Sequence, residues 1–283
     1  MSPVSVVIAS YNAADTLGEQ LDALLAQPWP GGGEIVVADN RSTDGTVDLL
    51  AAYADGPVSV RRVAVDDIAG AAHARNVAVE HVVHERIAFC DADDIVGPSW
   101  VAAMTDALRE HEFVGGPLDY REVNAPWLAG ARGRLLAADE PAMFEDIFPI
   151  VSSCNMGIHR TLFRTTGGFD GAFERVEDAE LSHRLWALGV RAHHHPDALV
   201  HYRMRTTQRA IFEQSRSWGR QLPRLRSKVG VRPSDRPIDS AKRWAWLIVR
   251  LPRTVDRAGR AHWLHVAGTR LGALESRLRV SMP

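Results

Sequence analysis

The strongest constraint on the fold is an alternation of short apolar runs with helix-like segments over residues 4–115. The apolar runs are rich in β-branched residues, which is typical of strands buried on both faces. The expected strands are residues 4–9, 34–38, 58–65 and 86–90, and the expected helices are residues 14–26, 43–52, 70–83 and 98–110. Strands that alternate with helices predict βαβ units and a mainly parallel sheet.

Polar clusters follow three of these runs, at Ser10-Tyr11-Asn12, at Asp39-Asn40 and at Asp91-Ala92-Asp93-Asp94. Open parallel sheets bind ligands at the carboxyl ends of their strands. The shared position of the clusters therefore indicates a binding site along one edge of the sheet, in preference to ordinary turns.

The run of aspartates after residues 87–90 is the strongest local signal. Asp91 and Asp93 stand two positions apart on a turning chain, so their carboxylates can converge on one hard cation. Magnesium and manganese prefer such oxygen ligands and commonly bridge a protein to phosphate groups. The alternative, an aspartate-rich turn that caps the next helix, stays open on this segment alone.

Charged residues that could serve a binding site also follow the second and the third expected strand. Asp39, at the end of the second strand, is placed to accept hydrogen bonds from a ribose or a base. Asp44 and Thr43 fit the simpler role of helix caps. Arg75 lies on the helix after the third strand, where it could meet a phosphate or form an ordinary salt bridge.

These segments together resemble a family 2 glycosyltransferase with the GT-A fold. The resemblance is carried by Val-Ser-Val-Val-Ile-Ala-Ser-Tyr-Asn, Ile-Val-Val-Ala-Asp-Asn-Arg-Ser-Thr-Asp-Gly-Thr, Ala-Arg-Asn and Asp-Ala-Asp-Asp, in the family's order and spacing. It covers roughly residues 3–205. It implies an α/β fold with a Rossmann-like, mainly parallel sheet flanked by helices, and inverting transfer of a sugar from a nucleotide-sugar donor.

The resemblance also implies roles for individual residues on the donor side. Ala9 and Tyr11 would line the nucleobase pocket, and Asp39 would bind the base or the ribose. Asp91 would contact the ribose or the metal, and Asp93 would ligate the Mn²⁺ or Mg²⁺ that holds the donor diphosphate. Such a cation neutralises charge on the leaving group as its bond breaks.

On the acceptor side, the family's later acidic motif matches Val-Glu-Asp-Ala-Glu-Leu at residues 176–181, where Asp178 would be the general base. An inverting transfer needs one carboxylate to take the proton of the acceptor hydroxyl. The competing interpretation is that these acidic residues only favour a helix N-terminus. His201 is a candidate further metal ligand by its position, although a lone histidine at a strand end is often structural. Asn155 and Gly157 resemble the family's acceptor-side segment.

The C-terminal part differs in charge from the rest. Residues 201–283 hold 19 Lys and Arg against 5 Asp and Glu, whereas residues 1–200 hold 14 against 30. We expect a catalytic domain at 1–205, with a nucleotide-sugar half at 1–117 and an acceptor half at 118–205, and a basic helical extension at 206–283. The acceptor half includes an irregular stretch at 118–149, and a linker is expected at 232–237.

The extension contains an apolar helical seam at Leu264, Ala267, Leu271, Leu274 and Leu278. Three packing partners for this seam remain open: the catalytic domain, an anionic membrane surface, or a second subunit of a homodimer. Nucleic acid is not expected as a partner, because the sequence contains no recognised nucleic-acid-binding module.

Other functions fit less well. A nucleotidyltransferase would carry a Gly-rich, Arg-containing loop after the first strand, and a dinucleotide oxidoreductase would carry Gly-x-Gly-x-x-Gly. The alternative that remains is a catalytically inactive nucleotide-sugar-binding protein. The donor base, the sugar, the linkage and the acceptor, whether a glycan, a lipid-linked molecule or a small molecule, cannot be read from the sequence.

The expected location is the cytoplasm, with a peripheral position on the inner face of the membrane as a second option. Cys90 and Cys154 are too few and too far apart for a disulfide scaffold or a zinc site, so we expect buried thiols in a reducing compartment. The start of the sequence lacks the features of a signal peptide, and no apolar run approaches the roughly 18 residues of a spanning helix.

Overall fold

The computed structural model describes residues 3–131, 141–231 and 237–280, which divide into two compact units. The first unit holds residues 3–123 and 141–203, and the second holds 124–131 and the residues from 204 onward. The division after residue 203 lies close to the expected boundary at 205. Residues 124–131, expected in the acceptor half, group with the helical unit instead. The linker expected at 232–237, except for Pro237, and residues 132–140 of the irregular stretch lie outside the described residues.

A seven-stranded sheet forms the centre of the first unit, with the strand order β11-β6-β10-β4-β1-β2-β3. Its strands are β1 (Val4–Ser10), β2 (Gly33–Asp39), β3 (Ser59–Ala64), β4 (Arg86–Asp91), β6 (Phe113–Gly115), β10 (Asn155–His159) and β11 (His193–His194). Strand β10 pairs antiparallel with β4 and β6, and the other pairings are parallel. The expected mainly parallel sheet is therefore confirmed, with β10 as an additional strand.

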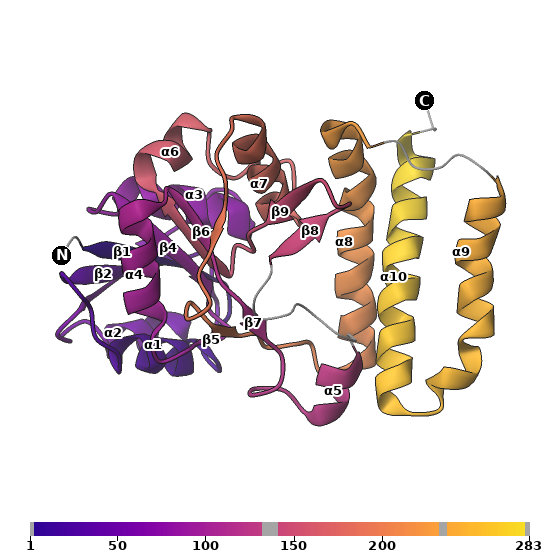
Figure 1. Ribbon diagram of the computed structural model, residues 1–283. Coiled ribbons are helices and arrows are strands. Elements are labelled where there is room, and N and C mark those ends of the chain that lie inside the picture. The colour runs from indigo at the N-terminus through magenta and orange to yellow at the C-terminus, as the bar shows by residue number, and fades with distance from the viewer. Residues whose placement is uncertain (1–2, 132–140, 232–236, 281–283) are drawn as a thin grey trace. The chain divides into compact units, whose positions relative to one another are not determined.

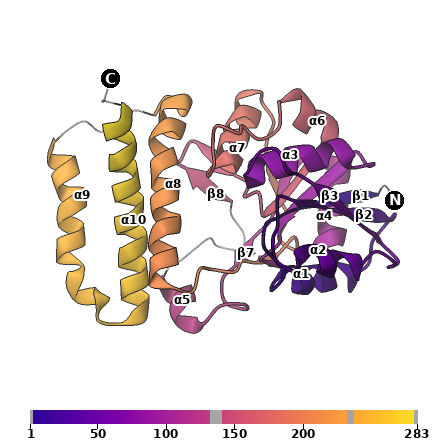
Figure 2. The ribbon, with the colours of Figure 1, turned by 180° about the vertical axis from the view of Figure 1, so that it is seen from behind.

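Helices cover both faces of this sheet because the strand residues alternate between two apolar layers. Val4, Val6 and Ile8 of β1 join one core with α1 (Leu17–Leu25), α2 (Thr46–Ala51) and α4 (Trp100–Glu110). Val7 joins the other core with α3 (Ala71–His81), α6 (Arg160–Thr165) and α7 (Glu177–Ala187). Figure 2 shows α3, α6 and α7 on one side of the strands and α1 and α2 on the other. This arrangement leaves the strand ends free for a site.

Two small sheets complete the first unit. Strand β12 (Val200–His201) pairs with β5 (Ile95–Val96) and with β7 (Leu118–Asp119). Strands β8 (Ala142–Phe144) and β9 (Phe148–Ile150) form an antiparallel hairpin whose turn holds Glu145 and Asp146 at φ 49° and 57°. The stretch at 118–149, expected as loops around short helices, thus also contains strands.

The second unit is helical. It comprises α5 (Pro126–Ala131), α8 (Gln208–Val229), α9 (Pro237–Val249), the 3₁₀-helix η1 (Leu251–Thr254) and α10 (Arg257–Val280). Figure 1 shows α8, α10 and α9 side by side. No helix in the described ranges is long and apolar enough to cross a membrane.

Helices α8 and α10 approach closely through glycines. A Cβ at Gly219 would collide with the backbone of Thr269, and a Cβ at Gly272 would collide with that of Arg216. The α10 face that meets α8 is therefore the one that carries Gly272, whereas the predicted leucine seam runs through Leu271 and Leu274. Within that seam, Leu274 and Leu278 remain 40% and 51% exposed.

Candidate active site

The ends of β1, β2 and β4 lie side by side, as the polar clusters predicted. Ala9 stands in register with Asp91 on one side and with Ala38 on the other, and Ser10 stands in register with Asp39. Ala9 is partly exposed, and Tyr11 is 65% exposed just beyond the strand end. The two residues predicted to line a nucleobase pocket are therefore accessible at the same sheet edge as the acidic residues.

Hydrogen bonds tie the loop after β1 to the loop after β2. Asn12, at φ 48°, donates from its backbone to Oγ of Ser42 (2.9 Å) and accepts from the backbone of Thr43 (2.8 Å). The Asp44 carboxylate accepts from the backbone of Ala14 (3.1 Å) and of Thr46 (3.0 Å). Asp44 consequently connects the two loops and orders the start of α2.

Asp39 is fully buried at the end of β2. Its Oδ1 accepts from the backbone of Ser42 at 3.2 Å, and its Oδ2 lies 2.7 Å from Nη2 of Arg62. Both carboxylate oxygens thus already have protein partners. A contact between Asp39 and a donor base or ribose stays a prediction.

Arg75 joins the end of β4 to the start of α7. Its side chain is 3% exposed, and its two terminal nitrogens lie 2.5 Å from Asp91 and 3.0 Å from Glu177. Nε of Arg75 has no hydrogen-bond partner among the described residues. Burial acts to lower the pKa of Arg75, but the two adjacent carboxylates raise it above its usual value. A permanent cation therefore sits inside the acidic site, where the sequence had suggested a phosphate contact.

Asp91, Asp94 and Cys154 bring their side-chain oxygen and sulfur atoms within 4.8 Å of one another. Asp94 is 1% exposed; its Oδ1 accepts from the backbone of Arg203 at 2.7 Å, and its Oδ2 has no partner in the described chain. Burial, then the charges of Asp91 and Asp93, raises the pKa of Asp94 well above its usual range. Like charges and an unpaired buried oxygen are the conditions under which a cation stabilises a site.

The donor set fits a hard divalent cation. Carboxylate oxygens are the ligands that Mg²⁺ and Mn²⁺ prefer. Burial raises the pKa of the Cys154 thiol well above its usual value, so Cys154 is neutral and is a poor ligand for such an ion. Both cysteines are free and buried, as expected.

Asp93 and His201, the other predicted metal ligands, do not belong to this cluster in the part of the chain that the structure describes. The side chain of Asp93 is partly exposed, and its backbone carbonyl accepts from Nε of Arg203 at 2.9 Å. Nδ1 of His201 lies 3.1 Å from Oδ2 of Asp119 on the neighbouring strand β7. The metal-ligand roles of both residues stay predictions.

The predicted general base, Asp178, lies in the first turn of α7. Val176, the residue before the helix, adopts a left-handed conformation at φ 60°, which is rare for a β-branched residue. Asp178 accepts from the backbone of Ala179 (2.7 Å) and of Ser153 (3.2 Å). Burial raises the pKa of Asp178, and burial together with Asp178 raises the pKa of Glu177 to about 7.

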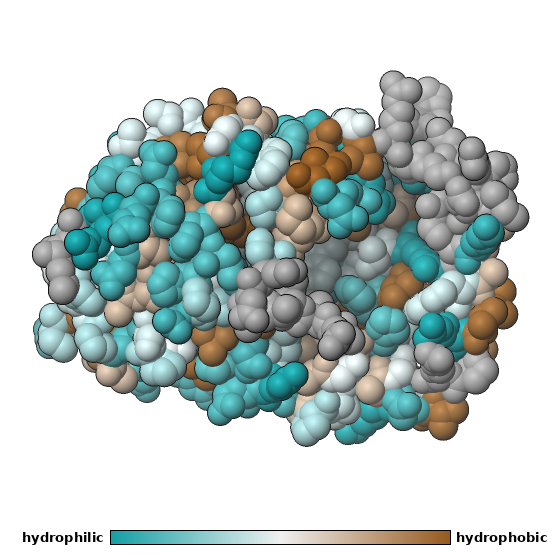
Figure 3. Space-filling view, in the orientation of Figure 1, coloured by the Kyte–Doolittle hydropathy of each residue, from teal (hydrophilic) through white to brown (hydrophobic). Residues whose placement is uncertain are grey.

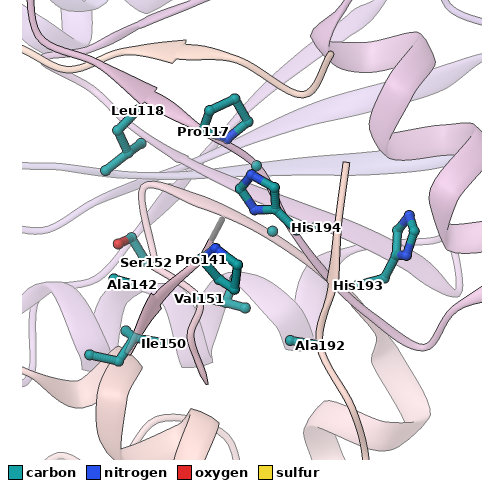
Figure 4. A pocket seen from close by; sticks show the side chains of 12 residues that line it. Pro117, Leu118, Pro141, Ala142, Ile150, Val151, Ser152, Ala192, His193 and His194 are labelled. Carbon is teal, nitrogen blue, oxygen red and sulfur yellow. The ribbon is translucent and has the colours of Figure 1, made fainter. Parts of the chain in front are cut away.

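The first unit also holds a pocket, which Figure 4 shows from close by. It is lined by Gly115, Gly116, Pro117, Leu118, Pro141, Ala142, Ile150, Val151, Ser152, Ala192, His193 and His194. Ser152 directly precedes Ser153, whose backbone donates to Asp178. Figure 4 shows the rings of His193 and His194 on different sides of β11, and His193 stacks on His111 at 3.8 Å. The consecutive residues His193 and His194 thus do not converge on one ion.

Several site residues had no clear signal in the sequence. Arg203 reaches the aspartate run from 109 and 110 residues away, and no local pattern pairs such distant positions. Glu177 is adjacent to the predicted base, but its ion pair with Arg75 depends on the fold. Asn155, expected on the acceptor side, is 1% exposed and bonds Trp100 and two backbone carbonyls, so it serves the packing of β10.

Known structures identify the class of this fold. The mannosyltransferase PcManGT from Pyrobaculum calidifontis, solved in complex with GDP-Man and Mn²⁺, matches with a TM-score of 0.70 and 19% sequence identity. The match covers 98% of this chain and 88% of that one. At this identity the likeness shows the fold, and the fold is the GT-A type expected from the sequence.

The family follows from the sequence comparison. The profile of Glycosyl transferase family 2 matches residues 5–167, and the chain belongs to that family. It is 25% identical to the glycosyltransferase GlyG of Streptococcus pneumoniae over 240 residues, which are 80% of this chain and 78% of GlyG. It is 35% identical over 125 residues to the uncharacterized glycosyltransferase YibD of Escherichia coli, where the match spans 44% of this chain and 34% of YibD.

Proposed function

We propose that this chain transfers a sugar from a nucleotide-diphosphate donor to an acceptor hydroxyl, with inversion and with help from a divalent cation. One observation carries the proposal. The buried Arg75 pairs with Asp91, the last residue of β4, and with Glu177, the first residue of α7 and the neighbour of Asp178. This pairing supports the proposal that donor-side and acceptor-side groups act in one site.

The donor side would be formed by the ends of β1, β2 and β4. Ala9 and Tyr11 offer accessible surface to a base, and the partly exposed Asp91 offers a carboxylate to a ribose. Asp39 is fully buried and paired with Ser42 and Arg62, so it would have to exchange a partner to reach the base or the ribose. Asp93 is partly exposed, so it is the member of the aspartate run that we assign to the cation, with Asp91 beside it. His201 would complete the set from β12. Bound Mn²⁺ or Mg²⁺ would supply charge neutralisation for the diphosphate leaving group.

Asp94 is the buried member of the aspartate run and would position the loop that carries the cation ligands. Its buried Oδ2 has no protein partner among the described residues, and its other oxygen holds the backbone of Arg203. We assign Asp94 the role of positioning the loop, because its 1% exposure leaves little access for a donor.

Asp178 would take the proton from the acceptor hydroxyl. Its raised pKa brings it closer to neutral pH, where a general base is most effective. Glu177 is a weaker candidate, because it is buried and its Oε1 is already held by Arg75. Two backbone N–H groups orient the Asp178 carboxylate. The pocket lined by Ser152, whose neighbour Ser153 bonds Asp178, would offer space for an acceptor.

The test is a panel of UDP-, GDP- and dTDP-sugars, each assayed with Mn²⁺ for a rise in melting temperature and for release of the nucleoside diphosphate. A donor that stabilises the protein and is consumed supports the proposal. Stabilisation by nucleotide sugars without turnover of any of them, with a range of acceptors present, would instead identify an inactive binding protein.

A further inference from the structure

The outer face of α9 carries an apolar stripe. Trp244, Ile248 and Val249 are 39%, 74% and 74% exposed, and Leu251 and Val255 in the turn that follows are 54% and 82% exposed. Ala241 and Ala245 are also exposed and share the helical face of Trp244 and Ile248, at spacings of three and four residues. Figure 3 shows apolar residues at the surface over α9. Such a concentration on one short segment marks an interaction surface.

The opposite face of α9 fixes this orientation within the second unit. Leu247 is 6% exposed, and its backbone carbonyl accepts from Nε1 of Trp263 on α10 at 2.8 Å. Arg270 of α10 and Arg250 lie 5.1 and 5.2 Å from the ring of Trp246. These contacts hold α9 against α10 and leave the apolar stripe outward.

The segment that carries the stripe is rich in positive charge. Residues 241–260 contain six Lys and Arg against the single acidic residue Asp256. Lys242 and Arg257 are exposed at the two ends of the segment. An amphipathic helix with Trp, aliphatic residues and cations lies in the interface of an anionic lipid surface. At 13 residues, α9 is too short to span one.

We propose that α9 and the turn after it, residues 241–257, bind the surface of a membrane that contains anionic lipids. A second copy of the chain fits this face less well, because a symmetric pairing would bring the two sets of cations together. Anionic headgroups would instead neutralise them while the apolar stripe is buried. The inference is independent of the proposed function, since none of these residues belongs to the site for sugar transfer.

Flotation of the full chain with lipid vesicles tests the proposal. The vesicles are phosphatidylcholine alone or phosphatidylcholine mixed with phosphatidylglycerol, at low and high salt. The apolar variant is Ile248→Ser/Val249→Ser, and the charge variant is Lys242→Gln/Arg257→Gln. The matched control, Val83→Ser/Leu188→Ser, removes two apolar side chains of the first unit that are each 68% exposed.

We expect the wild-type chain to float with the anionic vesicles only, and less so at high salt. The apolar variant should bind about tenfold more weakly or worse, because two side chains no longer leave water. The charge variant should lose its preference for anionic lipid, and the control should bind like wild type. Absence of wild-type flotation, or equal flotation of the apolar variant and the control, overturns the proposal. A wild-type dimer that the apolar variant converts to a monomer also overturns it.

Discussion

Arg75 shows how one buried charge organises a site. Its side chain is 3% exposed and contacts Asp91 of β4 and Glu177 of α7. A buried cation with two carboxylate partners leaves uncompensated charges when it is removed. The sequence identified Arg75 as a candidate, but its distant partner Glu177 could be recognised only in the folded chain.

Replacement of Arg75 by Ala should lower the free energy of unfolding by about 3–5 kcal/mol, since it leaves two carboxylates without their counter-ion. Arg164 is a matched control, because it pairs with Glu80 at 2.5 Å while both side chains remain about half exposed. Arg164→Ala should cost less than about 1 kcal/mol. Urea unfolding of the two variants measures both losses of unfolding free energy. Equal losses would show that Arg75 contributes no more to stability than an exposed ion pair does.

The pair of Glu177 and Asp178 gives a prediction for pH. Deprotonated Asp178 is the active form, and burial raises its pKa, so the rate of transfer should rise with pH to a plateau. Glu177, with a pKa of about 7, adds a second negative charge beside it as the pH rises. Burial, then the charge of Asp178, raises the pKa of Glu177, so Glu177 loses its proton after Asp178. Glu177→Gln should therefore leave the midpoint of the rise in place, because Glu177 is still neutral when Asp178 titrates. A rate–pH profile of both proteins tests this, and a midpoint that moves to lower pH in Glu177→Gln would contradict this order of titration.

At the scale of elements, the contact of α8 with α10 depends on glycines. A Cβ at Gly272 would strike the backbone of α8, whereas a Cβ at Gly130 of α5 would only touch Ala258 at 4.0 Å. Gly272→Ala should therefore destabilise the chain by about 1–3 kcal/mol despite the better helix propensity of alanine. Gly130→Ala should be neutral or slightly stabilising. Thermal unfolding of the two variants tests this, and a stabilised Gly272→Ala would contradict the close packing.

Much of the first unit could be predicted because local patterns determine it. The apolar runs at 4–9 and 34–38 became β1 and β2, and the aspartates followed β4 at the sheet edge as expected. Strand β10 was missed, since its five residues match no strong alternation and its pairing with β4 is long-range. The contact of α10 with α8 was not predicted, because it depends on glycines that let the two backbones approach closely.

The whole molecule combines two electrostatic environments. Acidic groups gather at the sheet edge of the first unit, whereas residues 201–283 carry 19 Lys and Arg against 5 Asp and Glu. A cation site and a surface for anionic lipids each require one of these environments. The sequence predicted the asymmetry and grouped Trp244, Leu247, Ile248 and Leu251 on one helical face. The structure leaves Trp244, Ile248 and Leu251 exposed and buries Leu247.

Cation binding can be measured on the intact chain without a donor. Mn²⁺ should raise the melting temperature of the wild-type protein, because it binds the folded carboxylates and relieves their repulsion. Asp93→Asn should show a smaller rise, and Asp48→Asn, a change in α2 away from the strand-end carboxylates, should behave like wild type. An equal rise in all three proteins would remove Asp93 from the cation site.

The most direct test of the account compares wild type with Asp178→Asn in transfer from the donor that the nucleotide-sugar panel identifies. The substitution keeps the size of the side chain and removes its ability to take a proton. The account predicts a loss of about 100-fold or more in turnover, with donor and Mn²⁺ binding retained. Full turnover by Asp178→Asn would contradict the assignment of the base, and with it the joined site around Arg75.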